Sequence, residues 1–387
     1  MKKYFFSLAV ILSSVLLTAC DDNDNGKNIY SVPVTKGAYV ICSGNVWGGI
    51  QGSLTYIDYA TGTASQNQFA AKNGRSLGST PNNAIVYGDK MYIAVTDDNT
   101  IEVVDAKTLA SIKQIKLTQL IDNVIGVSPR CITAADGIIY VSTYGASSNT
   151  FDSETWVTTT SGNGYVAAID TLTFSLKDTY TVGSYPEGLA VTNNYLVVAN
   201  SDYSAVTKAS LSVINLSTKE VETVTNAQIT NPTAVAIAGS DIYVLDMGNY
   251  YDVAGGIRKV TSADNVTTLF DCTNATFVGT KIYASNCVYG QDTDGFIVYD
   301  ISTGSKKNYD SGVSKFFYPN VVTADPITGN IFVASYSENA DTPNSPSYST
   351  NGYVVEYDAN GTKLKEYNCG VGPNAIVFNV GYEEIEY

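Results

Sequence analysis

Residues 81–86 read PNNAIV, and after a short turn residues 91–93 read MYI. Apolar and polar residues alternate within these runs, which is the period-2 pattern of half-buried strands. The same pair of runs recurs along the chain at intervals of 40 to 57 residues, each time behind a proline or a cysteine. Repeats of this length are typical of propellers and solenoids. The six leading residues are Pro81, Pro129, Pro186, Pro232, Cys272 and Pro319.

Each pair of runs leads into a third strand and then into a more polar fourth one. The third strands span residues 101–105, 165–170, 211–215, 257–260, 296–300 and 353–358, and residues 111–117 are an example of the fourth. Glycine, asparagine and aspartate separate the runs, as expected for turns. Four short antiparallel strands per repeat make one propeller blade.

The two ends of the chain supply a seventh blade. Residues 373–378 (PNAIVF) form an inner strand with no partner after it, whereas residues 38–41, 54–58 and 64–69 form three outer strands with no inner strand before them. Joining the ends closes the ring and removes an exposed strand edge. The sequence therefore predicts an all-β, seven-bladed β-propeller of four-stranded antiparallel blades over residues 37–387. A six- or eight-bladed ring and an open solenoid are the alternatives.

The N-terminus has the pattern of a secretory signal. Lys2 and Lys3 precede an apolar run over residues 4–17, which is too short for a membrane-spanning helix, and small residues lead up to Cys20. Residues 1–19 are therefore expected to be a signal peptide, and residues 20–36, with their acidic start, a solvated tether. The cysteine resembles the lipobox of bacterial lipoproteins, which implies lipidation of Cys20. An ordinary signal peptide with a chance cysteine is the alternative.

Composition and spacing argue against several classes of function. The net charge of −15 disfavours nucleic acid and anionic lipid as partners, which leaves the anchor as the only membrane contact. The chain has no histidine, the commonest general base and transition-metal ligand. No spacing rule pairs Asp246 with Glu187 as acid and base, and neither an acidic calcium loop nor a CxxC motif is present. We expect no catalytic residue, no metal and no cofactor, and therefore a binding protein rather than an enzyme.

Long loops point to one face of the propeller, where the loops between second and third strands lie beside the starts of the inner strands. Loops of this length in a compact fold usually carry function. Residues 145–164 contain Trp156, residues 43–52 contain Trp47, residues 337–352 contain Tyr348, and residues 249–251 include Tyr250. Aromatic side chains with a polar group are good anchors for ligands.

The mouth of the channel follows from the register of the repeats. One predicted ring of residues comes from the second strands, three residues beyond the aromatic residue (or Val197) of each, and its side chains are mostly neutral and polar. A second predicted ring comes from the inner strands and consists of the residue after each leader. Arg130 belongs to this second ring and either binds a phosphate or carboxylate in bidentate fashion or pairs with a nearby acid. The ligand-binding candidates on this face are Trp47, Arg130, Tyr144, Trp156, Tyr185, Asn200, Asp246, Tyr250, Asn286, Tyr318 and Tyr336.

Five cysteines remain after Cys20, and an exported protein permits disulfides among them. A two-residue turn at Gly279 and Thr280 places Cys272 opposite Cys287 on the neighbouring strand. Opposite residues have Cβ atoms about 4.5–5.5 Å apart, close to disulfide range. A Cys272–Cys287 bridge is therefore possible, although the register makes this a hydrogen-bonded pair, whose side chains are less close.

A typical repeat consists of a proline-led inner strand, a Tyr-Val run and an Ile-Asp turn. This repeated pattern, over about residues 37–379, resembles that of the YVTN/YncE-type propellers. With the lipobox and acidic run, the chain is similar to the BtuG-type cobalamin-capture lipoproteins of Bacteroidota. Gly44-Asn45, residues 53–58 (SLTYID) and Gly372-Pro373 match that family, whereas Cys42-Ser43 depart from its Asn-Glu.

That resemblance implies an outer-membrane, lipid-anchored protein that faces the cell exterior. It implies capture of a small-molecule ligand, a corrinoid, and transfer to a TonB-dependent outer-membrane transporter. The corrinoid is then a ligand and not a cofactor. A surface glycan-binding module and a protein-interaction scaffold are the alternative functions.

Overall fold

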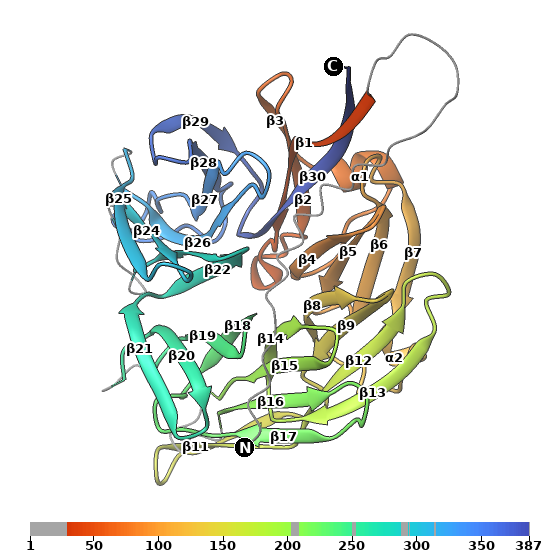
Figure 1. The fold of residues 1–387 in the computed structure, drawn as a ribbon, viewed down its shortest axis with the longest axis vertical. Coiled ribbons are helices and arrows are strands. Elements are labelled where there is room, and N and C mark those ends of the chain that lie inside the picture. Colours follow the sequence, from red (N-terminus) through yellow and green to blue (C-terminus); the bar gives the residue numbers. More distant parts are fainter. Residues whose placement is uncertain are drawn as a thin grey trace.

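The computed structural model describes residues 29–202, 209–249, 253–287, 293, 295–312 and 315–386. Within them, seven four-stranded antiparallel sheets stand around a central axis (Figure 1). In each sheet the innermost strand contains the repeated leader or begins just after it, and the later strands follow outward. The predicted all-β, seven-bladed propeller is confirmed.

The blades are numbered here by their inner strands. Blade 1 contains β4 (Pro81–Tyr87), β5 (Lys90–Val95), β6 (Thr100–Asp105) and β7 (Ser111–Lys116). Blade 2 contains β8 (Pro129–Ala135), β9 (Ile138–Thr143), β12 (Gly164–Asp170) and β13 (Leu176–Val182). Blade 3 contains β14 (Pro186–Val191), β15 (Tyr195–Asn200), β16 (Ser210–Asn215) and β17 (Val221–Val224). A separate hairpin between β9 and β12 consists of β10 (Ser148–Asp152) and β11 (Val157–Ser161).

The next three blades follow the same order. Blade 4 contains β18 (Pro232–Ala238), β19 (Asp241–Asp246), β20 (Gly256–Ser262) and β21 (Asn265–Asp271). Blade 5 contains β22 (Asn274–Val278), β23 (Lys281–Ser285), β24 (Gly295–Asp300) and β25 (Ser305–Asp310). Blade 6 contains β26 (Phe317–Ala324), β27 (Ile331–Tyr336), β28 (Tyr353–Tyr357) and β29 (Lys363–Asn368).

Blade 7 is made from both ends of the chain. Its strands, from the axis outward, are β30 (Pro373–Glu386), β1 (Ile29–Cys42), β2 (Ser53–Asp58) and β3 (Thr63–Ser65). This confirms the predicted closure. The β1–β30 pairing runs from Ile29 opposite Glu386 to Cys42 opposite Pro373, so residues 29–36, assigned above to the tether, belong to a strand. They are ordered as a strand because the end of β30 offers them a complementary backbone edge.

Helices are few and short. They are η1 (Val46–Gly48), α1 (Gln68–Asn73) and α2 (Leu117–Leu120). Residues 68 and 69, expected in the third outer strand of blade 7, instead begin α1, which buries Phe69 between blades 7 and 1. None of the helices in the described part of the chain has the length and apolar character of a membrane span.

The leading prolines occupy the first residue of five inner strands, β4, β8, β14, β18 and β30. Proline lacks a backbone N–H and cannot donate to the strand ladder, so it is tolerated at the first residue of a strand. Two blades differ: β26 begins two residues before Pro319, and β22 begins two residues after Cys272.

A break in strand pairing follows the leader in every inner strand except β22. Pro81 lies opposite Val95, but Asn83 lies opposite Ala94, so Asn82 has no partner in the ladder. Such β-bulges turn the extra side chain out of the sheet. The corresponding residues of the other blades are Arg130 and Cys131, Glu187 and Gly188, Thr233, Asn320, and Asn374.

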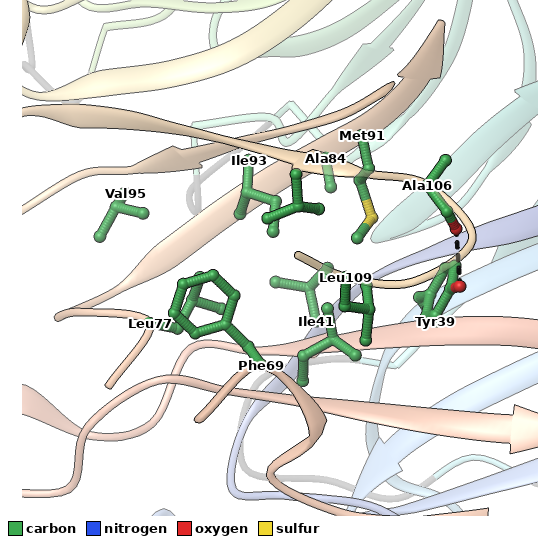
Figure 2. Close-up of a cluster of buried hydrophobic side chains, with 12 residues drawn as sticks. Tyr39, Ile41, Phe69, Leu77, Ala84, Met91, Ile93, Val95, Ala106 and Leu109 are labelled. Atoms are coloured by element: carbon green, nitrogen blue, oxygen red, sulfur yellow. Dashed lines mark hydrogen bonds between the residues drawn. The ribbon is translucent and has the colours of Figure 1, made fainter. Parts of the chain in front are cut away.

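The hydrophobic core lies between neighbouring blades rather than at one centre. Between blades 7 and 1, Ile41 and Phe69 pack against Ile93 (Figure 2). At the edge of this cluster the Tyr39 hydroxyl donates to the Ala106 carbonyl at 2.7 Å, which joins the two blades (Figure 2). Each blade is thus stabilised mainly by its neighbours, and the closing blade has to pack on both sides.

Replacing Ile41 tests the packing at this closure. Ile41 is fully buried between blades 7 and 1, so Ile41→Ala removes apolar contacts and leaves a cavity. We expect the free energy of unfolding, measured by urea titration, to fall by about 3 kcal/mol. The matched control is Ile112→Ala on β7, whose side chain is 46% exposed and whose change is expected to stay within about 0.5 kcal/mol. Equal losses for the two variants would contradict this packing.

Candidate ligand-binding site

A cavity of about 540 Å³ lies on the axis of the propeller. All seven inner strands contribute to its wall, and the bulge residues lie around it. Its lining is mostly amide and hydroxyl groups with small apolar side chains, and Arg130 and Glu187 are the charged residues in the described part of the wall. The bulges explain much of this composition, because in every inner strand except β22 they direct a polar side chain toward the axis.

The asparagines of this ring bond to the neighbouring blades. Each side-chain amide donates to a backbone carbonyl on the next inner strand, so the bonds run head to tail from blade 5 through blades 6, 7 and 1 to blade 2. The donor and acceptor pairs are Asn274 to Asn320, Asn320 to Pro373 at 3.1 Å, Asn374 to Asn82 at 2.8 Å and Asn82 to Arg130 at 3.0 Å. These amide donors therefore hold the ring together, and much of their capacity is not available to a ligand.

An ion pair continues the ring from blade 2 to blade 3. Arg130 Nε donates to Glu187 Oε2 at 3.0 Å, and the two side chains are only 20% and 6% exposed. The Tyr144 hydroxyl donates to the other oxygen of Glu187, and the Arg130 guanidinium lies 5.0 Å from the centre of the Tyr144 ring. Of the two roles considered for Arg130, pairing with an acid is the one that the structure contains. Together the pair adds no net charge to the cavity.

The Arg130 guanidinium stays charged, and its two terminal nitrogens can still donate hydrogen bonds. Burial alone lowers the pKa of a guanidinium, but the attraction of Glu187 outweighs it and raises the pKa of Arg130 above its ordinary value. Its two terminal nitrogens bond to none of the described residues, and the side chain lines the cavity. The Thr233 hydroxyl of the same wall is buried with no partner among the described residues. Both groups are available to an oxygen-bearing ligand.

The first aromatic group lies on the side of blades 2 and 3. Tyr144 and Tyr185 meet edge to face, with ring centres 4.8 Å apart. The β10–β11 hairpin carries Phe151 and Trp156, whose rings are 6.0 Å apart, and Trp156 is 79% exposed. The hairpin is fixed to blade 3 by the Thr160 hydroxyl, which donates to Asp202 at 2.6 Å. The long loop expected at residues 145–164 is thus an ordered arm.

The second aromatic group lies on the side of blades 6 and 7. The Tyr318 and Tyr336 rings are 6.2 Å apart, and Tyr336 and Tyr348 are 5.1 Å apart. The amide of Asn45 donates to the Tyr348 carbonyl at 3.0 Å, which connects this group to η1, where Trp47 is 97% exposed. Blades 2 and 6 are three steps apart in a ring of seven, so the two groups lie on opposite sides of the channel mouth (Figure 1).

Tyr185 and Tyr318 both have a left-handed backbone conformation, with φ of 48° and 67°. This conformation is unfavourable for a bulky residue and often marks a functional site. Here Thr80 and Ser128, which also precede a leading proline, have it as well, with φ of 57° and 53°. We therefore attribute it to the way these four inner strands begin, with a left-handed residue directly before the leading proline, and not to ligand binding.

Three further candidates lie away from the cavity. Asn200 and Asp246 are the last residues of second strands and are fully buried one strand away from the axis. The Asp246 carboxylate accepts bonds from Thr230 and Gly248, and the Asn200 amide donates to Ser210 and Ser212.

Asn286 is exposed and lines a different groove, between blades 4 and 5. The repeat register correctly predicted that Asn200 and Asp246 end their second strands. The inner strand of each blade, however, lies between them and the channel. Tyr250 and Cys20 lie outside the described residues.

Cys272 and Cys287 are both free thiols in this structure, as are Cys42, Cys131 and Cys369, so the Cys272–Cys287 disulfide stays a prediction. The two cysteines lie just beyond the end of the β22–β23 ladder, whose last pair on that side is Asn274 with Ser285. There the backbone of Cys272 turns to bond Gly255 of blade 4, and the Cys287 N–H donates to the Thr273 hydroxyl instead of a strand partner. The two segments stay hydrogen-bonded there, since the Thr273 N–H also donates to the Ser285 carbonyl at 2.9 Å.

No protein-family model and no curated protein matches the chain. Solved structures match its fold. Hydrazine synthase from Kuenenia stuttgartiensis has a TM-score of 0.55 at 12% identity, over 79% of this chain and 95% of that one. A Bacteroides fragilis protein named as a candidate 6-phosphogluconolactonase has a TM-score of 0.54 at 13% identity, over 89% and 98%. The WD40 repeats of RRP9 have a TM-score of 0.51 at 10% identity, over 76% and 82%. At such low identity these similarities show the propeller fold alone.

Removing the acid of the Arg130–Glu187 pair tests how much the pair contributes to stability. Glu187→Gln leaves the guanidinium charge in a mostly buried place without its acid, so we expect the free energy of unfolding to fall by about 2 kcal/mol in urea titrations. Glu222→Gln on the exposed face of β17 is the matched control and is expected to change it by less than about 0.5 kcal/mol. If both variants are equally stable, the ion pair does not help to hold blades 2 and 3 together.

Proposed function

We propose that the chain binds a large, flat, electrically neutral ligand across the mouth of its central channel. The observation that carries this proposal is the arrangement of the mouth: a polar cavity whose two charges cancel, with a tyrosine group on either side of it. Tyrosine and tryptophan supply large contact areas with few rotatable bonds, so they bind flat ligands at a small entropic cost.

The electrostatics favour a neutral ligand over an ion. A bound anion meets the Glu187 carboxylate beside Arg130, and a bound cation meets the guanidinium beside Glu187. The net charge of −15 further disfavours polyanions. Because the asparagine donors already bond to neighbouring blades, binding depends mainly on stacking. The terminal nitrogens of Arg130 and the Thr233 hydroxyl add a few directional hydrogen bonds to carbonyl or amide groups.

A corrinoid is the ligand that we propose within this class. It is a broad, flat macrocycle rimmed by neutral amide groups, which suits stacking between two tyrosine groups above a polar channel. The likeness of the N-terminal pattern and repeats to the cobalamin-capture lipoproteins supports the same choice, although Cys42 and Ser43 stand where those proteins have Asn-Glu. In this proposal the protein passes its ligand to a TonB-dependent transporter.

The direction in which the chain reaches the propeller supports surface capture. The strand β1 extends over 14 residues, about 45 Å, from Ile29 to Cys42, and the loop with Trp47 follows Cys42. Ile29 therefore lies at the end of the blade opposite the aromatic groups. A lipid on Cys20, as proposed from the lipobox, attaches on the side of Ile29 and leaves the mouth facing away from the membrane.

Calorimetric titration with cyanocobalamin and with cobinamide tests the ligand. We expect saturable heat for both and co-elution of the coloured ligand with the protein in gel filtration. No heat and no co-elution with either compound would overturn the corrinoid proposal. A glycan array on the same sample then separates a sugar-binding module from it.

Aromatic variants test the site. Trp156→Ala and Tyr185→Ala each remove a stacking surface, so we expect the Kd for the corrinoid to rise about tenfold in each case, which corresponds to about 1.4 kcal/mol. The matched control is Tyr382→Ala, which removes a side chain of 72% exposure from the opposite face and is expected to leave the Kd unchanged. A Kd that changes equally in all three variants would place the ligand elsewhere.

A protein-interaction scaffold is the second candidate function. The exposure of Trp47 and Trp156, 97% and 79%, favours it, because both are carried on projecting elements on the same face. Exposed tryptophans commonly anchor protein interfaces. Capture of an outer-membrane protein by the wild-type chain in the absence of corrinoid, lost in a Trp47→Ala, Trp156→Ala double variant, would favour this function over ligand capture.

A further inference from the structure

Two buried cysteines meet where the ring closes. Cys42 is the last residue of β1 in blade 7, and Cys369 directly follows β29 in blade 6. Both side chains are 0% exposed, and both belong to the hydrophobic cluster that joins these two blades. They are 327 positions apart in the sequence, so only the closure of the ring brings them together.

Several contacts place the two thiols against each other. A methyl group built on Gly370, the neighbour of Cys369, lies 3.1 Å from Cβ and 3.3 Å from Sγ of Cys42. A hydrogen bond between the two thiols, together with burial, raises the pKa of Cys369 well above its ordinary value. The backbone fixes both sides: Ser43 donates to Gly372 at 2.7 Å, and Cys369 donates to Gly352 at 2.9 Å.

We propose that Cys42 and Cys369 are a disulfide-forming pair that covalently joins blade 6 to the composite blade 7. The oxidant is a disulfide, either a small molecule or a protein. One cysteine thiolate attacks a sulfur of the oxidant, whose S–S bond breaks and releases the first thiol. The second cysteine thiolate then attacks the mixed disulfide, so the Cys42–Cys369 bond forms and the second thiol leaves. Two protein thiols are oxidised and one oxidant disulfide is reduced to two thiols.

Burial decides when this exchange takes place. In the closed ring neither thiol is accessible to an oxidant, and the raised pKa of Cys369 keeps its thiolate scarce. The bond therefore forms while the blades are assembling, before the ring is complete. Once formed, it is shielded from reductants by the same cluster.

The remaining cysteines do not compete for either partner. Cys131 lies on the cavity wall in blade 2, and Cys272 and Cys287 lie in blade 5. The five cysteines after Cys20 are then divided into the two of the Cys42–Cys369 disulfide and three further thiols. The Cys42–Cys369 disulfide also lies directly before the loop that carries Trp47, so it holds that loop in place independently of any ligand.

Peptide mapping tests the pairing, because trypsin separates the cysteines. Cys42 falls in the peptide of residues 37–72 and Cys369 in residues 366–387, while Cys131, Cys272 and Cys287 fall in residues 131–177, 260–281 and 282–306. The wild-type chain is denatured, reduced, refolded in a buffer of reduced and oxidised glutathione, and alkylated before digestion without reductant. We expect peptides 37–72 and 366–387 to be joined, two hydrogens lighter than their sum. Alkylation of both peptides, or attachment of either to a different cysteine peptide, overturns the proposal.

Thermal unfolding gives a second measurement. The oxidised protein is expected to unfold about 5 °C higher than the same protein refolded with dithiothreitol, because the bond constrains a very long loop of the unfolded chain. Cys42→Ser and Cys369→Ser abolish this difference, and Cys131→Ser, the matched control, retains it. A difference that survives in Cys369→Ser contradicts the proposal. The peptide map of the wild-type chain decides the pairing even if a serine variant fails to fold.

Discussion

The pairing of β1 with β30 is the contact on which the rest of the molecule depends. A propeller blade packs its faces against two neighbours, so a ring left open exposes an apolar face and a strand edge at each end of the gap. The N-terminal and C-terminal strands close that gap by pairing along their whole lengths, from Ile29 opposite Glu386 to Cys42 opposite Pro373. The pairing is long because it continues past the blade itself. It also orders residues that composition alone assigns to a tether.

Around the axis, the same geometry that builds the ring also builds the candidate site. Six of the seven inner strands have a bulge directly after the leader, and the bulge turns a polar side chain toward the channel. Most of these side chains bond to the adjacent blade, which makes the mouth rigid and electrically neutral. In the function that we propose, the ligand therefore binds mainly to aromatic side chains on the surrounding loops. A rigid polar base with aromatic walls suits a broad neutral molecule better than a small ion.

Much of the fold could be predicted because the repeats record it directly. The period-2 runs, the leaders and the unmatched strands at the two ends determine the number of blades and the closure without any knowledge of packing. The candidate site was predicted in part. Tyr144 and Tyr185 come together, as do Tyr318 and Tyr336, because they flank the leaders and the ends of second strands. Asn200 and Asp246 have the correct height in their blades but lie behind the inner strand, and register along a strand carries no information on distance from the axis.

The sequence by itself therefore determined the class of fold, the face that carries the long loops, and the aromatic residues on that face, since all three follow from local spacing. Only the tertiary structure decided which polar groups remain available. It pairs Arg130 with Glu187 and bonds Asn320 and Asn374 to neighbouring blades. It also brings Cys42 of blade 7 against the segment of blade 6 that carries Cys369. Such partners belong to different blades and are set by how the blades pack around the ring, which no local pattern encodes.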